Sequence, residues 1–357
     1  MISRLGDVTL AAALILTYQT FGTWSLDGIF AGAVRMREAG PAAQPEAVGW
    51  ICGLLVFAAL LKSAQFPFHS WLPDTMETPT PVSALMHAGV INAGGMLIIR
   101  FRDLITLSDG AMLMLCIIGG FTALFASAVM LTQASVKRCL AFSTVAQMGF
   151  MMFECGAGAF HLALLHLVAH SLYKAHAFLS AGGAVSAGSM PRYKAGNLAW
   201  LALCLIAALA VTFGTAVTLG VPLETQGAFH LIFAVGLAQM FWNFPPVLPK
   251  LYRVPLALAC AVVAAEVYFR LEKFAQTIAG PSASDATWAA YTVAAFFLLA
   301  AIAQNQLPRI ATSKLAYAIY VHARSGFYIN TLANRLTLAV WPSQLPKERV
   351  KWLQAWS

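Results

Sequence analysis

The chain has 357 residues, of which 60% are hydrophobic and only 10% are charged. One soluble core cannot bury so much apolar surface, so the composition excludes an ordinary soluble enzyme and leaves lipid as the main solvent. The net charge of +8 lies mostly in loops and toward the C-terminus, where membrane topology explains it better than nucleic-acid binding does.

Apolar runs bounded by charges or turn residues predict membrane-spanning helices rather than barrel strands. They cover residues 5–24, 47–66, 82–101, 111–131, 139–156, 159–186, 197–220, 228–248, 254–270 and 287–305. The predicted fold is therefore all-α and integral to a membrane, with about ten transmembrane helices. The six cysteines lie singly in apolar segments, so we expect neither a metal nor another cofactor.

The chain divides into a transmembrane domain, residues 1–308, and a tail, residues 309–357. The tail mixes Lys and Arg with Tyr, Trp and Leu, a pattern typical of an amphipathic helix at the membrane surface. When loops are assigned alternately to two sides, Lys and Arg are more numerous on the side of Lys137, Arg138 and the tail. That side is predicted to be cytoplasmic.

Four prolines follow the apolar run that contains Lys62. They are Pro67, Pro73, Pro79 and Pro81, and no continuous helix accommodates them. A helix broken within the bilayer frees backbone carbonyls that can hold a cation or water, as in transporters. A surface loop would explain the same prolines equally well.

His166, His170 and Lys174 are spaced i, i+4 and i+8, so they project from nearly the same face of one predicted helix. Neighbours in this row are about 6 Å apart along the helix axis, a gap that one water can bridge. A proton can then hop between the imidazoles and the amine. A single histidine here would more often be a core residue. His161 and His176 fall outside the row and are interpreted as lining or interfacial residues.

An ionisable side chain at membrane depth costs about 3 kcal/mol and usually serves transport. Among the lysines, only Lys62 and Lys174 lie within apolar segments, although Lys62 is close enough to a helix end to reach the surface. Asp7, in the first span, is a candidate partner for Lys62. His87, on the helix after the prolines, is a candidate link from Lys62 to the second group.

Two further carboxylates, Glu154 and Glu266, also lie at apolar positions. Each is close to a predicted helix end and has no companion in the sequence. We interpret both as solvated groups at helix ends.

Three segments resemble the antiporter-like subunits of respiratory complex I and of Mrp sodium/proton antiporters. They begin at Lys62-Ser-Ala-Gln-Phe-Pro, Lys137-Arg-Cys-Leu-Ala-Phe-Ser and His166-Leu-Val-Ala-His170-Ser-Leu-Tyr-Lys174, and the match runs from Arg4-Leu-Gly-Asp7 to about Gly183. The resemblance implies an antiporter-like bundle. It equates Asp7 with the family's acidic residue, Lys62 with its broken-helix lysine and His87 with its connecting histidine. His166, His170 and Lys174 correspond to its second-channel series.

Within that superfamily, His-Ser-Leu-Tyr-Lys174-Ala-His176-Ala-Phe-Leu and Tyr320-Val-His-Ala-Arg-Ser-Gly-Phe-Tyr328-Ile-Asn resemble the DabB subunit of bacterial inorganic-carbon pumps. This implies a bacterial inner-membrane complex with DabA, a large zinc protein related to β-carbonic anhydrases that would hydrate carbon dioxide to bicarbonate. Flow of protons or Na⁺ through the present chain would drive that partner, so this chain is expected to be a transporter subunit and not itself an enzyme.

The chain departs from the resembled family in two places. The family has several helices before the Arg-Leu-Gly-Asp segment, so the chain is expected to be truncated at its N-terminus. The complex I branch carries a lysine in its second broken helix, whereas the run from Leu201 to Leu219 contains none. The second half-channel is therefore expected to exit differently or to be incomplete.

Two rival functions fit the same sequence. One is a sodium/proton antiporter or a proton-pumping respiratory subunit, which neighbouring genes would distinguish. The other is a membrane scaffold that anchors an enzyme and whose polar residues are structural.

Overall fold

The chain is described by a computed structural model over residues 2–183, 197–221, 226–243, 250–280, 287–310 and 313–340, and these residues form helices and turns without a strand. In chain order the elements are α1 Ile2–Phe21, α2 Leu26–Ala39, η1 Pro41–Ala43, α3 Glu46–Lys62, η2 Phe68–Ser70, α4 Trp71–Asp74, η3 Thr75–Glu77, α5 Thr80–Ala88, η4 Val90–Asn92, α6 Ala93–Arg100, α7 Arg102–Ile105, α8 Asp109–Met130, α9 Val136–Gly156, α10 Phe160–Leu179, α11 Leu198–Thr218, α12 Gly227–Trp242, α13 Lys250–Ala279, α14 Thr287–Ile310, α15 Lys314–Arg324, η6 Gly326–Tyr328 and α16 Ile329–Val340.

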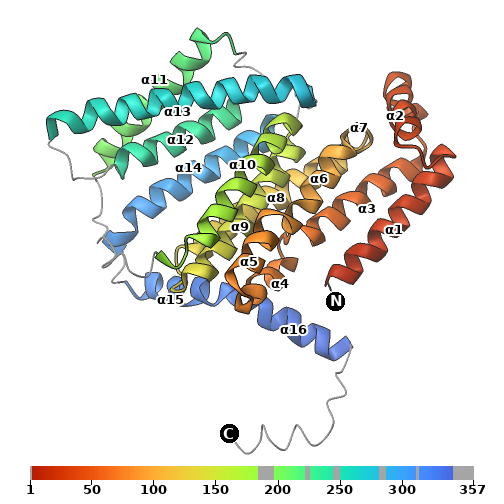
Figure 1. Cartoon of the computed structure of the whole chain (residues 1–357), viewed down its shortest axis with the longest axis horizontal. Coiled ribbons are helices and arrows are strands. Elements are labelled where there is room, and N and C mark those ends of the chain that lie inside the picture. The colour runs from red at the N-terminus through yellow and green to blue at the C-terminus, as the bar shows by residue number, and fades with distance from the viewer. Residues whose placement is uncertain are drawn as a thin grey trace, which may run out of the picture.

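The long helices form two adjoining groups. Helices α1, α3, α8, α9 and α10 lie side by side, and α11, α12 and α13 pack together next to α10 (Figure 1). α2 and α7 lie at one end of the first group, and α4, α15 and α16 lie at the other (Figure 1). We call these the α7 end and the α15 end.

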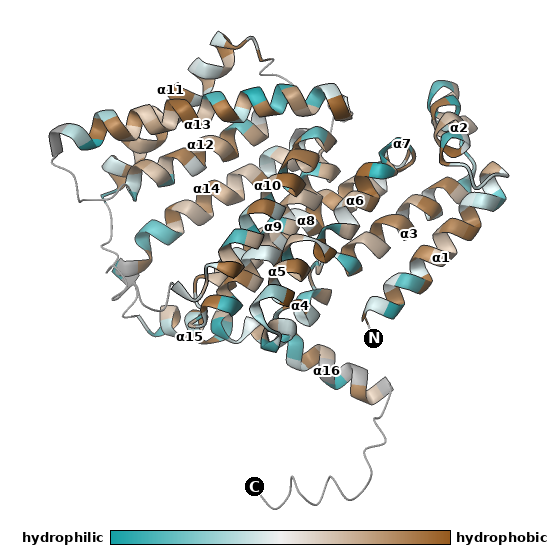
Figure 2. Cartoon of the chain, viewed as in Figure 1, coloured by the Kyte–Doolittle hydropathy of each residue, from teal (hydrophilic) through white to brown (hydrophobic). Residues whose placement is uncertain are grey.

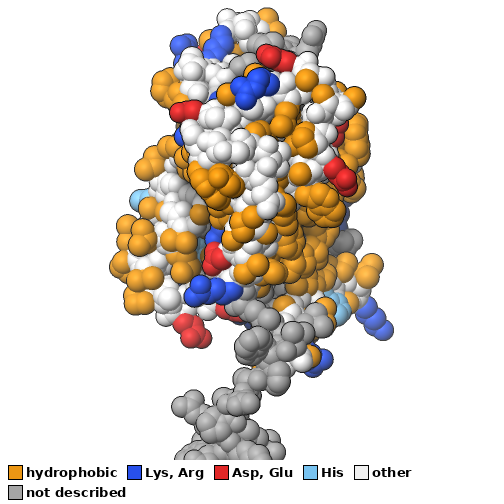
Figure 3. All heavy atoms as spheres, turned by 90° about the vertical axis from the view of Figure 1, so that its right-hand side faces the viewer, with side chains coloured by type: hydrophobic (Ala, Val, Ile, Leu, Met, Phe, Trp, Pro, Cys, Tyr) orange, Lys and Arg blue, Asp and Glu red, His pale blue; other side chains and the backbone are white. Residues whose placement is uncertain are grey.

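Hydrophobic residues predominate along α3, α8, α11 and α14, whereas hydrophilic residues gather in the second half of α13 (Figure 2). Seen from the side of α1 and α2, hydrophobic side chains cover the middle of the molecule and charged side chains lie mostly toward its two ends (Figure 3). This is the surface of a protein embedded in a bilayer, where helices satisfy every backbone hydrogen bond internally.

Five helices among the described residues are long and apolar enough to cross a membrane. They are Thr80–Arg100, Asp109–Met130, Leu198–Thr218, Tyr252–Ala279 and Trp288–Leu307. The all-helical membrane fold is confirmed, and the count of about ten spans stays a prediction. The ends of two predicted spans, residues 184–186 and 244–248, lie outside the described residues.

Helices α8 and α9 pack so closely that three glycines have no room for a side chain. A Cβ atom on Gly119 would lie 2.5 Å from the Phe153 backbone nitrogen, and one on Gly149 would lie 2.6 Å from that of Ala123. On Gly156 it would lie 2.2 Å from the Cys116 backbone nitrogen. Backbone cannot move aside as a flexible side chain can, so these small residues set the helix spacing, as is common in membranes.

Replacing Gly156 with alanine is expected to lower the free energy of unfolding by about 1–3 kcal/mol, because the added methyl group forces α8 and α9 apart. Thermal unfolding of the purified protein in detergent measures this as a lower midpoint. Gly214→Ala in α11 is the matched control, because a Cβ atom there meets nothing within 4 Å. An unchanged midpoint for Gly156→Ala would contradict the close packing.

The C-terminal elements run along the α15 end of the helices. Gln133 Nε2 donates to the Arg324 carbonyl at 3.2 Å, and Asn330 Nδ2 donates to Asp74 Oδ1 at 3.0 Å. The ring centroids of Phe125 and Phe327 are 5.7 Å apart. α14 continues to Ile310, past the predicted domain boundary at residue 308, and α15 and α16 are separate helices. The interfacial role of the tail stays a prediction, and residues 341–357 lie outside the described residues.

Candidate proton path

Asp7 and Lys62 form an ion pair between α1 and α3. Lys62 Nζ donates to Asp7 Oδ1 at 2.7 Å, and the side chains are 25% and 47% exposed for Lys62 and Asp7. Gly6 lies at this contact between the helices, where a Cβ atom would make an ordinary van der Waals contact, 3.5 Å, with the Leu61 Cβ. The two opposite charges neutralise each other beside the end of α3.

Replacing Asp7 with asparagine is expected to slow proton flux about two- to fivefold, the range for a partly exposed pair. The neutral amide removes the charge that holds the Lys62 amine in place. Proton uptake by vesicles containing the purified complex measures the change. Asp27→Asn in α2 is the control, and equal rates for both variants would argue against a role for the pair.

The segment after Lys62 consists of short turns. α3 ends at Lys62, and the backbone amide of Gln65 donates back to the Leu60 carbonyl at 3.0 Å. Each proline lies in or beside one of the short elements: Pro67 before η2, Pro73 in α4, Pro79 before α5 and Pro81 in the first turn of α5. The Phe66 amide donates to Thr122 Oγ1 at 3.1 Å, which holds the segment against α8. Ser63 Oγ donates to the Ile91 carbonyl at 2.8 Å, which connects it to η4.

His87 lies in the last turn of α5 and is completely buried. Its ring stacks on Phe178 of α10 with a centroid distance of 4.5 Å. Neither ring nitrogen has a hydrogen-bond partner within the described part of the chain. The imidazole is close enough to interact electrostatically with both His170 and Lys174. It therefore adjoins the row on α10.

Lys174 is completely buried between α9 and α10. Its Nζ donates to Ser143 Oγ at 2.7 Å and to the Leu140 carbonyl at 3.3 Å. Both ring nitrogens of His170, one turn away, lack a hydrogen-bond partner among the described side chains and backbone. An amine held by neutral acceptors has no carboxylate to fix its charge, so it can release and take up a proton.

His166 continues the row, with its ring centroid 6.2 Å from that of His170. Its Nδ1 lies 2.9 Å from Glu154 Oε2, and its Nε2 lies 2.8 Å from Gln147 Oε1. The interpretation of Glu154 as a solvated group is wrong. Its side chain is 7% exposed and faces α10 from α9. The end of α9 is buried by neighbouring helices, which exclude water from this carboxylate. Glu266 is partly exposed and pairs with Arg270 at 2.9 Å, but it lies within α13 and not at a helix end.

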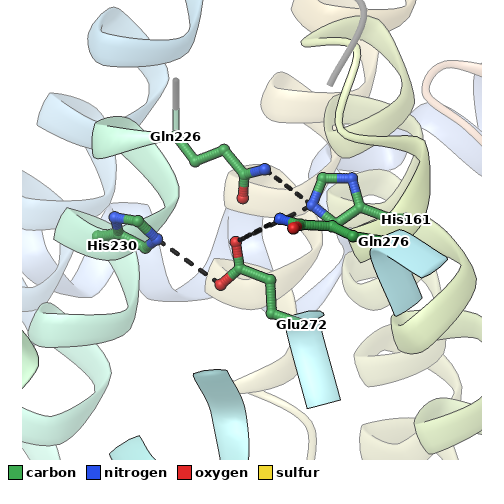
Figure 4. Close-up of polar contacts among 5 residues, drawn as sticks. All are labelled: His161, Gln226, His230, Glu272 and Gln276. Carbon is green, nitrogen blue, oxygen red and sulfur yellow. Dashed lines mark hydrogen bonds and ion pairs between the residues drawn. The ribbon is translucent and has the colours of Figure 1, made fainter. Parts of the chain in front are cut away.

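The two off-row histidines of α10 have different environments. His176 is exposed, whereas His161 is completely buried. His161 belongs to a second cluster with His230 and Glu272, which the sequence reasoning missed (Figure 4). The predicted span 254–270 stopped short of Glu272, but α13 continues to Ala279.

The six predicted path residues lie in two places. Asp7 and Lys62 form one pair, and His87 forms the second group with the α10 row.

Rows of buried titratable side chains inside apolar helices are typical of membrane proteins that conduct protons or other cations. The class defined by fold and site is therefore an all-helical membrane protein with a row of buried titratable side chains. The chain belongs to the family described as NADH:quinone oxidoreductase/Mrp antiporter, transmembrane, whose model matches residues 1–244.

Curated relatives of the chain fall in two groups. A "probable inorganic carbon transporter subunit DabB2" of Halothiobacillus neapolitanus is 36% identical over 96% of this chain and 64% of the relative. A DabB subunit of the same description from Hydrogenovibrio crunogenus is 36% identical over 96% of this chain and 66% of its own length. NADH-quinone oxidoreductase subunit L of Mycobacterium tuberculosis is 39% identical over 60% of this chain and 32% of the relative. The chain thus spans about two thirds of the length of the DabB relatives.

Among solved structures, the Mrp complex from Dietzia sp. is similar, with a TM-score of 0.49 and 23% identity over 99% of this chain and 41% of that chain.

Proposed function

We propose that this chain is the proton-conducting membrane subunit of an energy-coupled inorganic-carbon uptake complex. The observation that carries the proposal is the buried Lys174 amine, which hydrogen-bonds only neutral groups among its described contacts and stands in file with His170 and His166. The 36% identity to DabB subunits along almost the whole chain supports the choice of inorganic carbon as the cargo.

In the proposed path a proton enters at the Asp7–Lys62 pair, passes His87 and reaches the α10 row. The stacked position of His87 beside Phe178, near His170 and Lys174, supports this order. Along the α10 row, neighbouring groups lie close enough for one water to carry a proton between them. The hydrogen bond from Lys174 to Ser143 keeps the amine aimed toward α9 in either state.

The partner would be a DabA-like zinc subunit on the cytoplasmic side of a bacterial inner membrane. Downhill proton passage would make its hydration of carbon dioxide effectively one-way. The basic residues at the start of α9, Lys137 and Arg138, support the placement of the α15 end in the cytoplasm. The tail helices α15 and α16 lie at that same end and would face the partner (Figure 1).

The test is bicarbonate accumulation in cells without carbonic-anhydrase activity that express the full-length protein with a DabA-like partner. Accumulation is expected in the presence of a proton gradient and is expected to collapse when a proton uncoupler is added. Absence of accumulation from an assembled complex would overturn the proposal.

A sodium/proton antiporter or respiratory role is the second candidate, favoured by the match to subunit L over 60% of the chain. In that case vesicles containing this chain would exchange Na⁺ for protons without any carbon substrate. A sodium gradient that changes internal pH in such vesicles would favour this candidate over carbon uptake.

A further inference from the structure

A buried carboxylate lies outside the path described above. Glu272, in the second half of α13, is 1% exposed and points between α10 and α12 (Figure 4). His161 in the first turn of α10 lies with its Nε2 4.0 Å from Glu272 Oε1. His230 in the first turn of α12 lies with its Nε2 3.7 Å from Glu272 Oε2. Both histidines are completely buried, so three helices converge on one carboxyl group.

One bound proton would neutralise the charge of this cluster. An unpaired carboxylate in an apolar interior costs free energy. With one proton, the cluster is either a neutral carboxyl group beside two neutral rings or an ion pair between the carboxylate and one protonated ring, and its net charge is zero in both cases. Both ring nitrogens of His230 and Nδ1 of His161 lack a hydrogen-bond partner in the described ranges. These atoms are positions that a transferred proton can occupy.

The surroundings can adapt to either protonation state. Gln226 Nε2 lies 2.8 Å from His161 Nε2, and rotation of this amide by 180° exchanges its donor for an acceptor. Gln276 Nε2, one turn along α13, donates to Glu272 Oε1 at 3.4 Å. Of the other elements packed on α13, α11 carries no acidic or basic side chain over Leu198–Thr218. Lys273, next in sequence, is exposed and donates to the Leu219 carbonyl.

A cavity of about 490 Å³ borders the α10 row at His166 and reaches α13 beside this cluster. Its lining includes Gln147, Glu154, His166 and Tyr268, together with Leu271, the residue before Glu272. A space of this size with several polar groups in its wall can hold water.

Tyr268 lies near the carboxylates of both sites. It is one turn before Glu272 on α13 and is close enough to interact electrostatically with both Glu154 and Glu272. Its hydroxyl can both donate and accept a hydrogen bond, as a relay between a water chain and a carboxylate requires.

The cluster also lies at the opposite end of α10 from the Lys174 amine. Lys174 is toward the α15 end, and His161 is thirteen residues earlier, about 20 Å along the helix axis. The hydrocarbon layer is about 30 Å thick, so the distance from Lys174 to His161 covers much of it. The starts of α10 and α12 and the end of α13 meet where His161, His230 and Glu272 lie.

We propose that Glu272, His161 and His230 form a second proton-binding site, which connects the α10 row through Glu154, the cavity and Tyr268 to the α7 end of the helices. The inference rests on the proposed proton-conducting function and adds to it the terminal on the side opposite Lys137 and Arg138. Glu272 on α13 gives the path an exit, although α11 contains no lysine that could take this role.

The first test compares three substitutions on α13 in vesicles containing the assembled complex. Glu272→Gln is expected to reduce proton flux about 100-fold, the effect of losing a positioned proton carrier. Glu272→Asp is expected to retain a measurable part of the flux. Glu266→Gln, which removes a partly exposed carboxylate paired with Arg270, is expected to leave the flux unchanged. Equal flux for Glu272→Gln and wild type would overturn the proposal.

The second test needs no variant and reports on the site even if Glu272→Gln fails to assemble. Dicyclohexylcarbodiimide reacts with protonated carboxyl groups in apolar surroundings, and mass spectrometry locates the adduct. Glu272 in the wild-type complex is expected to be labelled increasingly as the pH falls, and Glu266 is not. Absence of label on Glu272 at every pH would overturn the proposal. A complex that conducts no protons but is labelled at Glu272 would refute the proposed function and leave the proton-binding site intact.

Discussion

Replacing Lys174 with alanine is expected to abolish proton flux, with a fall of about 100-fold or more, because the row on α10 then lacks its only amine. The side chain is completely buried, and its Nζ is held by Ser143 and by the Leu140 carbonyl. Alanine leaves those acceptors without a donor and removes the group that carries the proton. Proton uptake by vesicles and uncoupler-sensitive bicarbonate accumulation in cells both measure the loss.

Lys174→Arg separates proton transfer from a purely structural role of the charge. Arginine keeps the positive charge and the hydrogen bonds but is never deprotonated in proteins, so flux is expected to remain lost. Lys314→Ala, at the exposed start of α15, is the matched control for removing a lysine. Normal flux in Lys174→Arg would show that the site needs only a charge and would contradict the relay.

The local arrangement of the α10 row could be predicted from the sequence because helix geometry alone determines it. Residues four apart share a face in any α-helix, and a lysine within an apolar run must find polar company. The row and its burial therefore follow from His166, His170 and Lys174 without knowledge of the other helices. The pairing of Asp7 with Lys62 needed only that the first two spans be neighbours.

The partners of the row depend on tertiary packing and were beyond such reasoning. Glu154 is buried only because α10 packs on the end of α9, which no local pattern indicates. Glu272 offered a signal that went unused. The buried face of α13 includes Ala261, Ala265, Phe269 and Ala275, and Glu272 falls in this helical series, whereas Glu266 and Arg270 fall outside it. Charges on the opposite face made the apolar run end too early.

Glu154→Gln is expected to reduce proton flux about tenfold or more. The carboxylate lies 2.9 Å from His166 Nδ1 and positions the ring, and a neutral amide of the same shape forms a weaker hydrogen bond to it. The measurement is the initial rate of proton uptake by vesicles, with Glu46→Gln at the exposed start of α3 as the control. A rate equal to that of wild type would show that proton flux does not depend on the Glu154 carboxylate.

The double variant Glu154→Gln, Glu272→Gln distinguishes one path from two. If a proton passes Glu154 and Glu272 in series through the cavity, blocking the slower step already limits the flux, so the double variant is expected to be no slower than the slower single variant. If the two carboxylates serve parallel branches, each single variant leaves one branch open, and only the double variant loses all flux. Tyr268, which lies within electrostatic reach of both carboxylates, favours the serial outcome. Tyr268→Phe removes only the hydroxyl of that connection, and it is then expected to slow flux in the wild-type background but not in the double variant.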